Sequence, residues 1–355
     1  MFKKIKEISK ITIGKTPSTN NSKFWKNGEV YWYTVYDISN NLLYPKKLIS
    51  FLAIKENNQP LTNNNSLLYS MVRYIKPFIP IENSSFNQGI AKIDVNTDII
   101  LRKYLYYNFI FNKRKINSLR KGSTFPSINS YILSNLIIFI PSIEKQQRII
   151  DIIEPFEKLK SNLEEQKEKI MNLLKCIYKI FSSKEEVFLS ELVKISSTKY
   201  DNQKYYVDTS NIGILNFKGK EIITKLKSRA NLTPTLDSFI ISKMIGENKV
   251  FPIYDLYFKN FVYSTGFLNL IPLKFEAYIL GYLLSDDFIK NKGNLVTGTL
   301  MASLTNSSFN NLKIKRPIVE NISKTTQLIT LLNKIEITIM QTNTLITNLI
   351  NKLVN

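Results

Sequence analysis

Few residues in this chain could carry out covalent chemistry. It has no histidine and a single cysteine, Cys176, among its 355 residues. Ser/His/Asp and Cys/His nucleophiles and the common zinc sites therefore cannot be assembled. The run Gly14-Lys15-Thr16 resembles part of a phosphate-binding loop, but Pro17 stands where the helix of that motif would continue. We therefore expect no catalysis, no metal and no bound cofactor.

The composition favours binding to a polyanion instead. The formal net charge is +21 and the isoelectric point is near 9.7, and polyanions are the usual partners of such a surface. Residues 1–142 contain 20 basic and 7 acidic side chains (+13), whereas residues 183–312 contain 15 and 12 (+3). Composition drift in an AT-rich genome is the alternative source of the many lysines, but uniform drift would not favour one half so strongly.

Basic, aromatic and hydroxyl side chains alternate in the first segment, as expected of a surface that meets phosphates and bases. A core position is the alternative for each aromatic residue, and a helix-capping turn is the alternative for Ser123. The candidate DNA-binding residues are Lys15, Thr16, Lys23, Lys26, Trp32, Arg73, Gln88, Arg120, Lys121 and Ser123, with Lys227, Arg229, Lys243 and Lys249 in the second half.

Two long helices must position these segments. Apolar residues recur with heptad spacing within residues 143–181 and again within residues 323–354, which favours a pair of coiled-coil helices over two helices packed on their own domains. Pro155 predicts a kink in the first helix, and Cys176 is expected to be buried beside the seam. The expected seam residues are Phe156, Leu159, Leu163, Ile170, Leu173, Ile177, Leu328, Leu332, Ile335, Ile339, Ile346 and Leu349.

An internal repeat relates the two halves of the chain. Residues 122–128 match residues 298–304 at a constant offset of 176, and the same offset relates Pro141 to Pro317. With four more residues inserted, Gln147 matches Gln327. Landmarks in the same order at near-constant spacing indicate a duplication. Strand-like runs are expected at 30–35, 66–72, 136–140, 205–207, 239–242 and 261–264, and helical stretches at 99–116 and 277–284.

These motifs resemble the DNA-specificity subunits of type I restriction-modification systems along essentially the whole chain. The resemblance is carried by Gly14-Lys15-Thr16-Pro17-Ser18 with Trp32-Tyr33-Thr34, by Phe86-Asn87-Gln88-Gly89, and most specifically by Gly122-Ser123-Thr124-Phe125-Pro126-Ser127-Ile128 with Glu144-Lys145-Gln146-Gln147-Arg148-Ile149. It implies a non-catalytic subunit in which each of two domains reads one half of a split double-stranded DNA site. It also implies that two helices fix the gap, that two methyltransferase subunits dock, and that restriction subunits complete the complex.

We therefore predict an α+β chain with two globular target-recognition domains in a pseudo-twofold repeat, separated by a pair of long antiparallel coiled-coil helices. The expected segments are a first domain at 1–142, a central spacer helix at 143–182, a second domain at 183–312 and a C-terminal spacer helix at 313–355. A stand-alone DNA-binding or scaffold protein without methyltransferase partners is the alternative, and a metal-dependent nuclease is a third class. We expect a cytoplasmic protein, because no run approaches the ~18 apolar residues of a membrane span.

Overall fold

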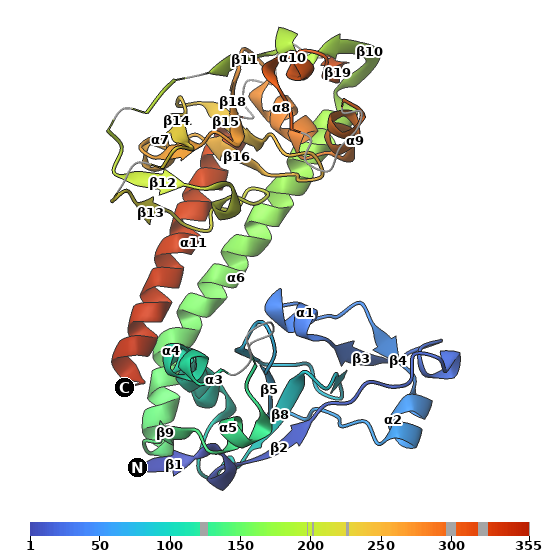
Figure 1. Cartoon of the computed structure of the whole chain (residues 1–355), viewed down its shortest axis with the longest axis vertical. Helices are drawn as coiled ribbons and strands as arrows, with labels where there is room; N and C mark the ends of the chain where they lie inside the picture. Colours follow the sequence, from blue (N-terminus) through green and yellow to red (C-terminus); the bar gives the residue numbers. More distant parts are fainter. Residues whose placement is uncertain are drawn as a thin grey trace. The chain divides into compact units, whose positions relative to one another are not determined.

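The chain forms two compact units, one comprising Met1–Lys158 with Thr344–Asn355 and the other comprising Leu159–Asn343 (Figure 1). This computed structural model describes residues 1–120, 127–196, 198–200, 202–224, 227–295, 303–318 and 326–354. Among these residues, no helix has the length and apolar character needed to cross a bilayer. Each unit contains one mixed α/β domain together with segments of the two long helices.

The first domain is built on a four-stranded antiparallel sheet in the order β2-β8-β5-β6. The central strand β5 is buried along its whole length, and the edge strand β6 contains Pro77, which cannot donate to a further strand. A second, smaller sheet has the order β4-β3-β7, with β3 parallel to β7. The elements are β1 (Phe2–Lys4), η1 (Ile5–Glu7), β2 (Ser9–Ile13), η2 (Ser22–Phe24), β3 (Val30–Tyr33), α1 (Val35–Ser39), β4 (Leu48–Ile49), α2 (Phe51–Asn57), β5 (Ser66–Ser70), β6 (Lys76–Phe78), β7 (Ser85–Phe86), β8 (Ile90–Val95), α3 (Arg102–Phe111), α4 (Lys113–Ser118), α5 (Ser130–Ser134) and β9 (Ile137–Phe139).

The second domain has the same topology. Its main sheet has the order β11-β18-β15-β16, with a fully buried β15 and with Pro252 on the edge strand β16. Its smaller sheet again contains a parallel pair, β12 with β17. The elements are β10 (Ser182–Phe188), η3 (Leu189–Glu191), β11 (Val193–Ser196), β12 (Tyr205–Val207), η4 (Thr209–Asn211), β13 (Glu221–Ile222), β14 (Ala230–Leu232), β15 (Ser238–Ser242), β16 (Val250–Ile253), α7 (Leu256–Lys259), β17 (Val262–Ser264), β18 (Phe267–Pro272), α8 (Glu276–Leu283), α9 (Asp286–Asn294), α10 (Asn306–Phe309) and β19 (Lys313–Pro317).

The repeat is also seen in two isolated β-bridges, whose serine residues are related by the predicted offset of 176. Ser127 forms a β-bridge to Val72, and Ser303 forms the corresponding bridge to Met244. In both domains the first strand pairs antiparallel with the last strand. Strand β1 pairs with β9 in the first domain, and β10 pairs with β19 in the second. The α+β duplication predicted from the sequence is therefore confirmed.

The two long helices are α6 (Ile143–Ile180) and α11 (Thr326–Leu353). Helix α6 continues through Pro155 without a break. Strand β19 occupies the start of the segment predicted as the C-terminal helix, and the described part of that helix starts at Thr326. The helices run antiparallel in each unit. In unit 2 the N-terminal part of α11 packs in one core with the C-terminal part of α6, and in unit 1 the C-terminal residues of α11 join the core that contains Ile149 and Ile153.

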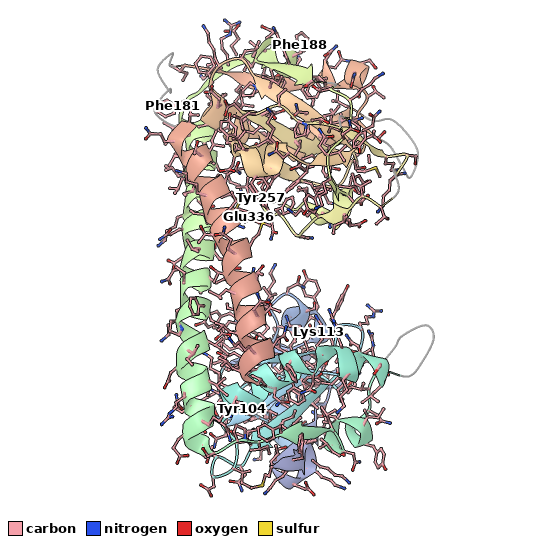
Figure 2. All side chains as sticks on the ribbon, turned by 90° about the vertical axis from the view of Figure 1, so that its left-hand side faces the viewer. Tyr104, Lys113, Phe181, Phe188, Tyr257 and Glu336 are labelled. Atoms are coloured by element: carbon pink, nitrogen blue, oxygen red, sulfur yellow. The ribbon has the colours of Figure 1, made fainter. Side chains whose placement is uncertain are left out.

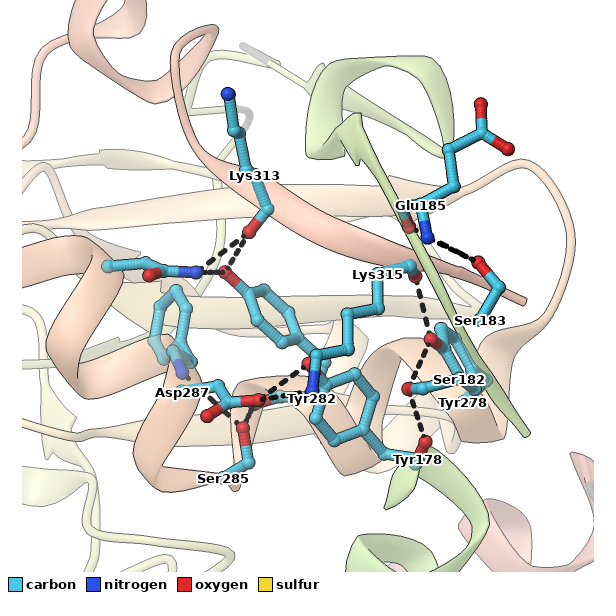
Figure 3. A network of polar contacts seen from close by, with 12 residues as sticks. Tyr178, Ser182, Ser183, Glu185, Tyr278, Tyr282, Ser285, Asp287, Lys313 and Lys315 are labelled. Atoms are coloured by element: carbon cyan, nitrogen blue, oxygen red, sulfur yellow. Dashed lines mark hydrogen bonds and ion pairs between the residues drawn. The ribbon is translucent and has the colours of Figure 1, made fainter. Parts of the chain in front are cut away.

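A polar network attaches the C-terminal end of α6 to the second domain (Figure 3). The Tyr178 hydroxyl donates to Oδ2 of Asp287 over 2.9 Å. The Ser182 hydroxyl donates to the Tyr178 carbonyl over 2.6 Å and lies 2.8 Å from the Tyr278 hydroxyl. The Tyr278 hydroxyl donates in turn to the carbonyl of Lys315 over 2.7 Å. The expectation of a buried Cys176 is wrong, because its side chain is exposed on α6. Burial on this helix follows the domain contacts as well as the helix partner.

Candidate nucleic-acid interface

In the first domain, three candidate residues meet at the turn between β7 and β8. Gly14 passes so close to this turn that a Cβ there would lie 2.1 Å from the carbonyl oxygen of Asn87. Only glycine fits, and the next residue, Lys15, donates its main-chain N–H to Phe86 over 3.0 Å. The Thr16 hydroxyl then donates to the side-chain oxygen of Gln88. Lys15, Thr16 and Gln88 therefore lie together, and all three side chains are exposed.

The two candidate arginines lie beside the same turn. The carbonyl of Gly89 accepts the N–H of Met71 over 2.9 Å, which places the β5–β6 turn next to the β7–β8 turn. Arg73 occupies that β5–β6 turn with a left-handed φ of 58°. Arg120 donates from Nη2 to the Arg73 carbonyl over 3.0 Å. The structure thus brings Arg73 and Arg120 together around Gly89.

Trp32 does not fit the role of a base-contacting residue. Its side chain is only 4 % exposed, and its indole N–H donates to the Lys15 carbonyl over 3.3 Å. The ring packs edge-on against Trp25 at 5.0 Å. Trp32 therefore supports the Lys15 loop from the core. A core position is the alternative that the sequence analysis gives for each aromatic residue.

Lys23 and Lys26 lie farther along the chain, at the 3-10 helix η2. Both side chains are exposed. Lys26 lines an open surface pocket with Trp25 and Lys47, and the Lys47 ammonium lies 5.8 Å from the centre of the Trp32 ring. These cations add positive charge near the loop that carries Lys15.

The second domain repeats this arrangement with different side chains. The N–H of Gly266 donates to the Ser264 hydroxyl over 3.2 Å, as the N–H of Gly89 donates to the Asn87 side chain over 3.2 Å. The Gly266 carbonyl accepts the N–H of Lys243 over 2.9 Å. Thr265 therefore occupies the position of Gln88. Sequence reasoning could have found Thr265 by carrying the first domain's Asn-Gln-Gly turn onto Ser264-Thr265-Gly266.

The four basic candidates of the second domain separate into two kinds. The main chain of Arg229 lies at the turn, because its carbonyl accepts the N–H of Thr265 over 2.9 Å, and Lys243 lies there too. Lys227 is ion-paired with Glu221 and also lies over the Tyr206 ring. Lys249 is ion-paired with Glu247 at 2.9 Å. The positive charges of Lys227 and Lys249 are thus partly compensated.

A pocket of about 210 Å³ opens on the second domain beside this turn. Burial lowers the pKa of the half-buried Lys243, one of its lining residues. The sequence analysis did not select the other polar residues of the lining, because they come from four separate segments. They are Ser196, Lys199, Asn231, Thr265 and Asn306.

Two candidates, Lys121 and Ser123, lie outside the described residues. The segment that follows them is described, and Ile128 donates its N–H to the Met71 carbonyl over 3.0 Å. In the second domain Leu304 donates to the Lys243 carbonyl over 2.8 Å. The repeated glycine-containing segment therefore ends, in both domains, against the residue that follows the central strand. Among the described residues, no group of three carboxylate or cysteine side chains is placed to hold a metal ion.

The expected seam residues are not buried uniformly. Ile177, Leu332, Ile335 and Ile339 are at most 7 % exposed, whereas Leu159 and Leu173 are 43 % and 47 % exposed. The remaining six are half-buried: Phe156, Leu163, Ile170, Leu328, Ile346 and Leu349. Leu174, which the heptad assignment passed over, is fully buried in its place. The buried face of each helix is rotated from a simple heptad stripe because each helix also packs on a domain.

Polar residues that the heptad pattern did not select fix the helices to the domains. Gln146 is fully buried; its amide group donates to the Ile99 carbonyl over 2.9 Å and accepts from the N–H of Leu101 over 2.8 Å. On α11, Asn333 accepts from the N–H of Tyr254 over 2.7 Å. Glu336, labelled in Figure 2, is 3 % exposed. Such side chains fix the rotation of a helix because each buried polar group needs its partner.

Comparison with known proteins gives consistent results. Residues 1–172 match the family described as type I restriction modification DNA specificity domain. The chain is 29 % identical over 208 residues to the type I restriction enzyme MjaIX specificity subunit of Methanocaldococcus jannaschii, covering 54 % of this chain and 47 % of that protein. It is 28 % identical over 174 residues to the EcoR124I/EcoR124II specificity subunit of Escherichia coli, covering 46 % and 42 %. The chain thus spans about half the length of these curated relatives. The crystal structure of a type I restriction-modification S subunit from M. genitalium has the same fold, with a TM-score of 0.58 at 14 % identity over 100 % of this chain and 96 % of that chain.

Proposed function

We propose that the chain selects the DNA target of a type I restriction-modification complex, because residues 1–172 match the DNA specificity domain family and the chain is similar to two curated specificity subunits. Each domain, at 1–142 and 183–312, reads one half of a bipartite double-stranded site. The observation that carries this proposal is the duplicated turn at Gly89 and Gly266, with exposed polar and basic side chains on the same backbone frame in both domains. Phosphate contacts by lysine and arginine would position the duplex, and side chains at the turns would contact base edges.

The proposed partners are double-stranded DNA, two methyltransferase subunits and the restriction subunits of the full complex. The chain itself would catalyse nothing; methylation and cleavage would belong to the partners. Exposed apolar side chains on both long helices support docking of other subunits, since solvated helices normally carry polar residues there. They are Ile152, Leu159, Leu173, Ile180, Leu331 and Leu345, each at least 40 % exposed. We place the complex in the cytoplasm, where it meets DNA.

We propose that the helix pair sets the gap between the half-sites. In the antiparallel pair Lys167 lies opposite Glu336, so residues 158–164 lie opposite residues 339–345. Deleting both segments removes one matched heptad and shortens the pair by about 10 Å. That length corresponds to about three base pairs of DNA. The gap should shrink by this amount while each half-site stays the same.

The test is sequencing of methylated bases in cells that carry the gene, lack it, or carry the double deletion. The bipartite methylated motif should disappear without the gene, and its gap should shorten in the double deletion. A matched control deletes only residues 158–164, which puts the two helices out of register and should reduce methylation without shortening the gap. Half-sites that change while the gap stays constant would contradict the spacer role. Cells that express the chain and show no bipartite motif would contradict the proposed function itself.

A further inference from the structure

The residue that follows the central strand is held by the same main-chain hydrogen bonds in both domains. In the first domain this residue is Met71, whose N–H donates to Gly89 and whose carbonyl accepts from Ile128. In the second domain it is Lys243, whose N–H donates to Gly266 over 2.9 Å and whose carbonyl accepts from Leu304 over 2.8 Å. Lys243 is therefore fixed on both sides of its Cα atom.

The side chains at this position differ in polarity between the domains. Met71 is 6 % exposed and belongs to the core of the first domain. Lys243 is half-buried and lines the pocket with Asn231, Thr265 and Phe267. Among the described residues, its ammonium has no hydrogen-bond or ion-pair partner. A partly desolvated ammonium without a partner favours an external acceptor that completes its hydrogen bonds.

A second lysine fixes the peptide group that precedes Lys243. Lys292 on α9 is only 3 % exposed, and its ammonium donates to the Ser242 carbonyl over 2.7 Å and to the Glu247 carbonyl over 2.9 Å. Ser242 is the last residue of β15, and Glu247 lies within the loop that joins β15 to β16 (Val250–Ile253). The Glu247 carboxylate is itself paired with Lys249 at 2.9 Å. The Lys292 side chain thus holds together two main-chain carbonyls, those of Ser242 and Glu247.

We infer that Lys243 donates a hydrogen bond to an acceptor on a base edge of the second half-site, and that Lys292 is its positioning residue. This inference rests on the proposed function. A lysine that binds a phosphate serves as a charge on a long flexible stem, whereas the Lys243 main chain is fixed at three consecutive points and its side chain is half-buried in the pocket lining. Fixed donors give base discrimination, because the wrong base leaves them unpaired. The neighbouring amide of Asn231 and hydroxyl of Thr265 give the pocket further polar groups at the same edge.

The experiment uses the complex isolated through a tag on the full chain. Binding is measured on duplex libraries in which either the first or the second half-site is randomised. The wild-type protein should show a sequence preference in both libraries. K243M should relax the preference at one position of the second half-site, by roughly ten- to a hundredfold. The first half-site profile and the salt dependence of binding should be unchanged.

The positioning role of Lys292 is tested by comparing the double variant with the two single variants. K292M should relax the same base position, and K243M/K292M should lose no more discrimination than K243M alone, because the two residues act on one contact. K290M on the same helix is the matched control and should leave that position unchanged, because the Lys290 side chain is exposed. Thermal unfolding of each variant separates a displaced loop from an unfolded domain. K243M tests the base contact even if K292M does not fold.

Three outcomes would overturn the inference. A uniform loss of affinity over all sequences with a shallower salt slope in K243M would make Lys243 a phosphate contact. An unchanged profile in K243M would exclude the contact altogether. Additive losses in the double variant would show that Lys292 acts independently of Lys243. A wild-type complex without any sequence preference would instead refute the proposed function before a variant is examined.

Discussion

Glu336 joins three elements of the second unit through one buried carboxylate. Its Oε1 accepts from the N–H of Phe217 over 2.6 Å, and its Oε2 accepts from the Lys167 ammonium over 2.8 Å. Phe217 belongs to the second domain, Lys167 to α6 and Glu336 to α11. The side chain of Glu336 is 4 % exposed and that of Lys167 is 17 % exposed. Replacing Glu336 should therefore loosen both helices from the domain at once.

The expected cost follows from these partners. E336A leaves the Phe217 N–H without an acceptor, which costs about 1–3 kcal/mol. It also leaves a mostly buried ammonium without its counter-charge, and breaking a buried pair costs about 3–5 kcal/mol in total. Because Lys167 keeps some contact with water, we expect about 3 kcal/mol for E336A. E336Q retains an amide oxygen for the N–H of Phe217 and should cost about half as much.

The assay is urea unfolding of the full chain, with hydrogen exchange at Phe217 as a local reporter. E336A should lower the urea midpoint more than E336Q does, and Phe217 should exchange faster in both variants. E165A removes the ion pair of Glu165 with Lys169 on the solvated face of α6 and should leave the midpoint unchanged. The reasoning fails if E336A unfolds at the wild-type midpoint, or if E165A shifts it equally.

Three further expectations concern single side chains. A Cβ on Gly281 would lie 2.2 Å from a main-chain oxygen of α6, whereas a Cβ on Gly293 would meet nothing within 4 Å; G281A should destabilise by about 1–3 kcal/mol and G293A should not, as thermal melts would show. Burial lowers the pKa of Lys292 to about 8, so between that pH and the ordinary lysine pKa the unfolded chain holds a proton that the folded chain has lost. The unfolding free energy should therefore rise with pH over this range, relative to K292M, and parallel urea curves at pH 7.5 and 9.5 for the two proteins would refute it. K23Q should reduce the log–log salt slope of DNA binding by about 0.9, and K227Q should reduce it less because its cation is already paired with Glu221; equal reductions in a titration would count against this charge assignment.

The sequence predicted the repeat because it leaves direct traces in spacing. The 176-residue offset found in the sequence relates Ser127 to Ser303, and the structure gives these two residues equivalent bridges. The strand-like and helical runs also correspond to elements, for example β5, β15, α3 and α8. The sequence singles out Gly14 in a run that only partly resembles a phosphate loop and that contributes to the family resemblance, but neither pattern explains why the position needs glycine. Its structural reason is the close approach to Asn87.

The parts that sequence reasoning missed depend on contacts between distant segments. The heptad rule assumes that a helix has one partner, but α6 and α11 also pack on the domains, so Leu173 is exposed and Leu174 is buried. Buried polar residues such as Gln146 and Glu336 carry no signal in an apolar pattern. Trp32 is of a residue type that often contacts bases, but its side chain lies in the core of the domain. Local spacing cannot distinguish these cases, because the Trp32 ring is buried by residues of η2, β4 and α2 that are distant from it in the sequence.

The shared backbone at Met71 and Lys243 has a consequence for how such a chain changes over evolution. The main-chain hydrogen bonds at this position involve no atom of either side chain. One domain folds with an apolar side chain there and the other folds with a cation. The position therefore accepts side chains of different polarity with the same main-chain hydrogen bonds. Under the proposed function, a new preference for DNA would then arise by one substitution that leaves folding intact. Each half of the duplicated chain would then be able to change its proposed target while the other half keeps its own.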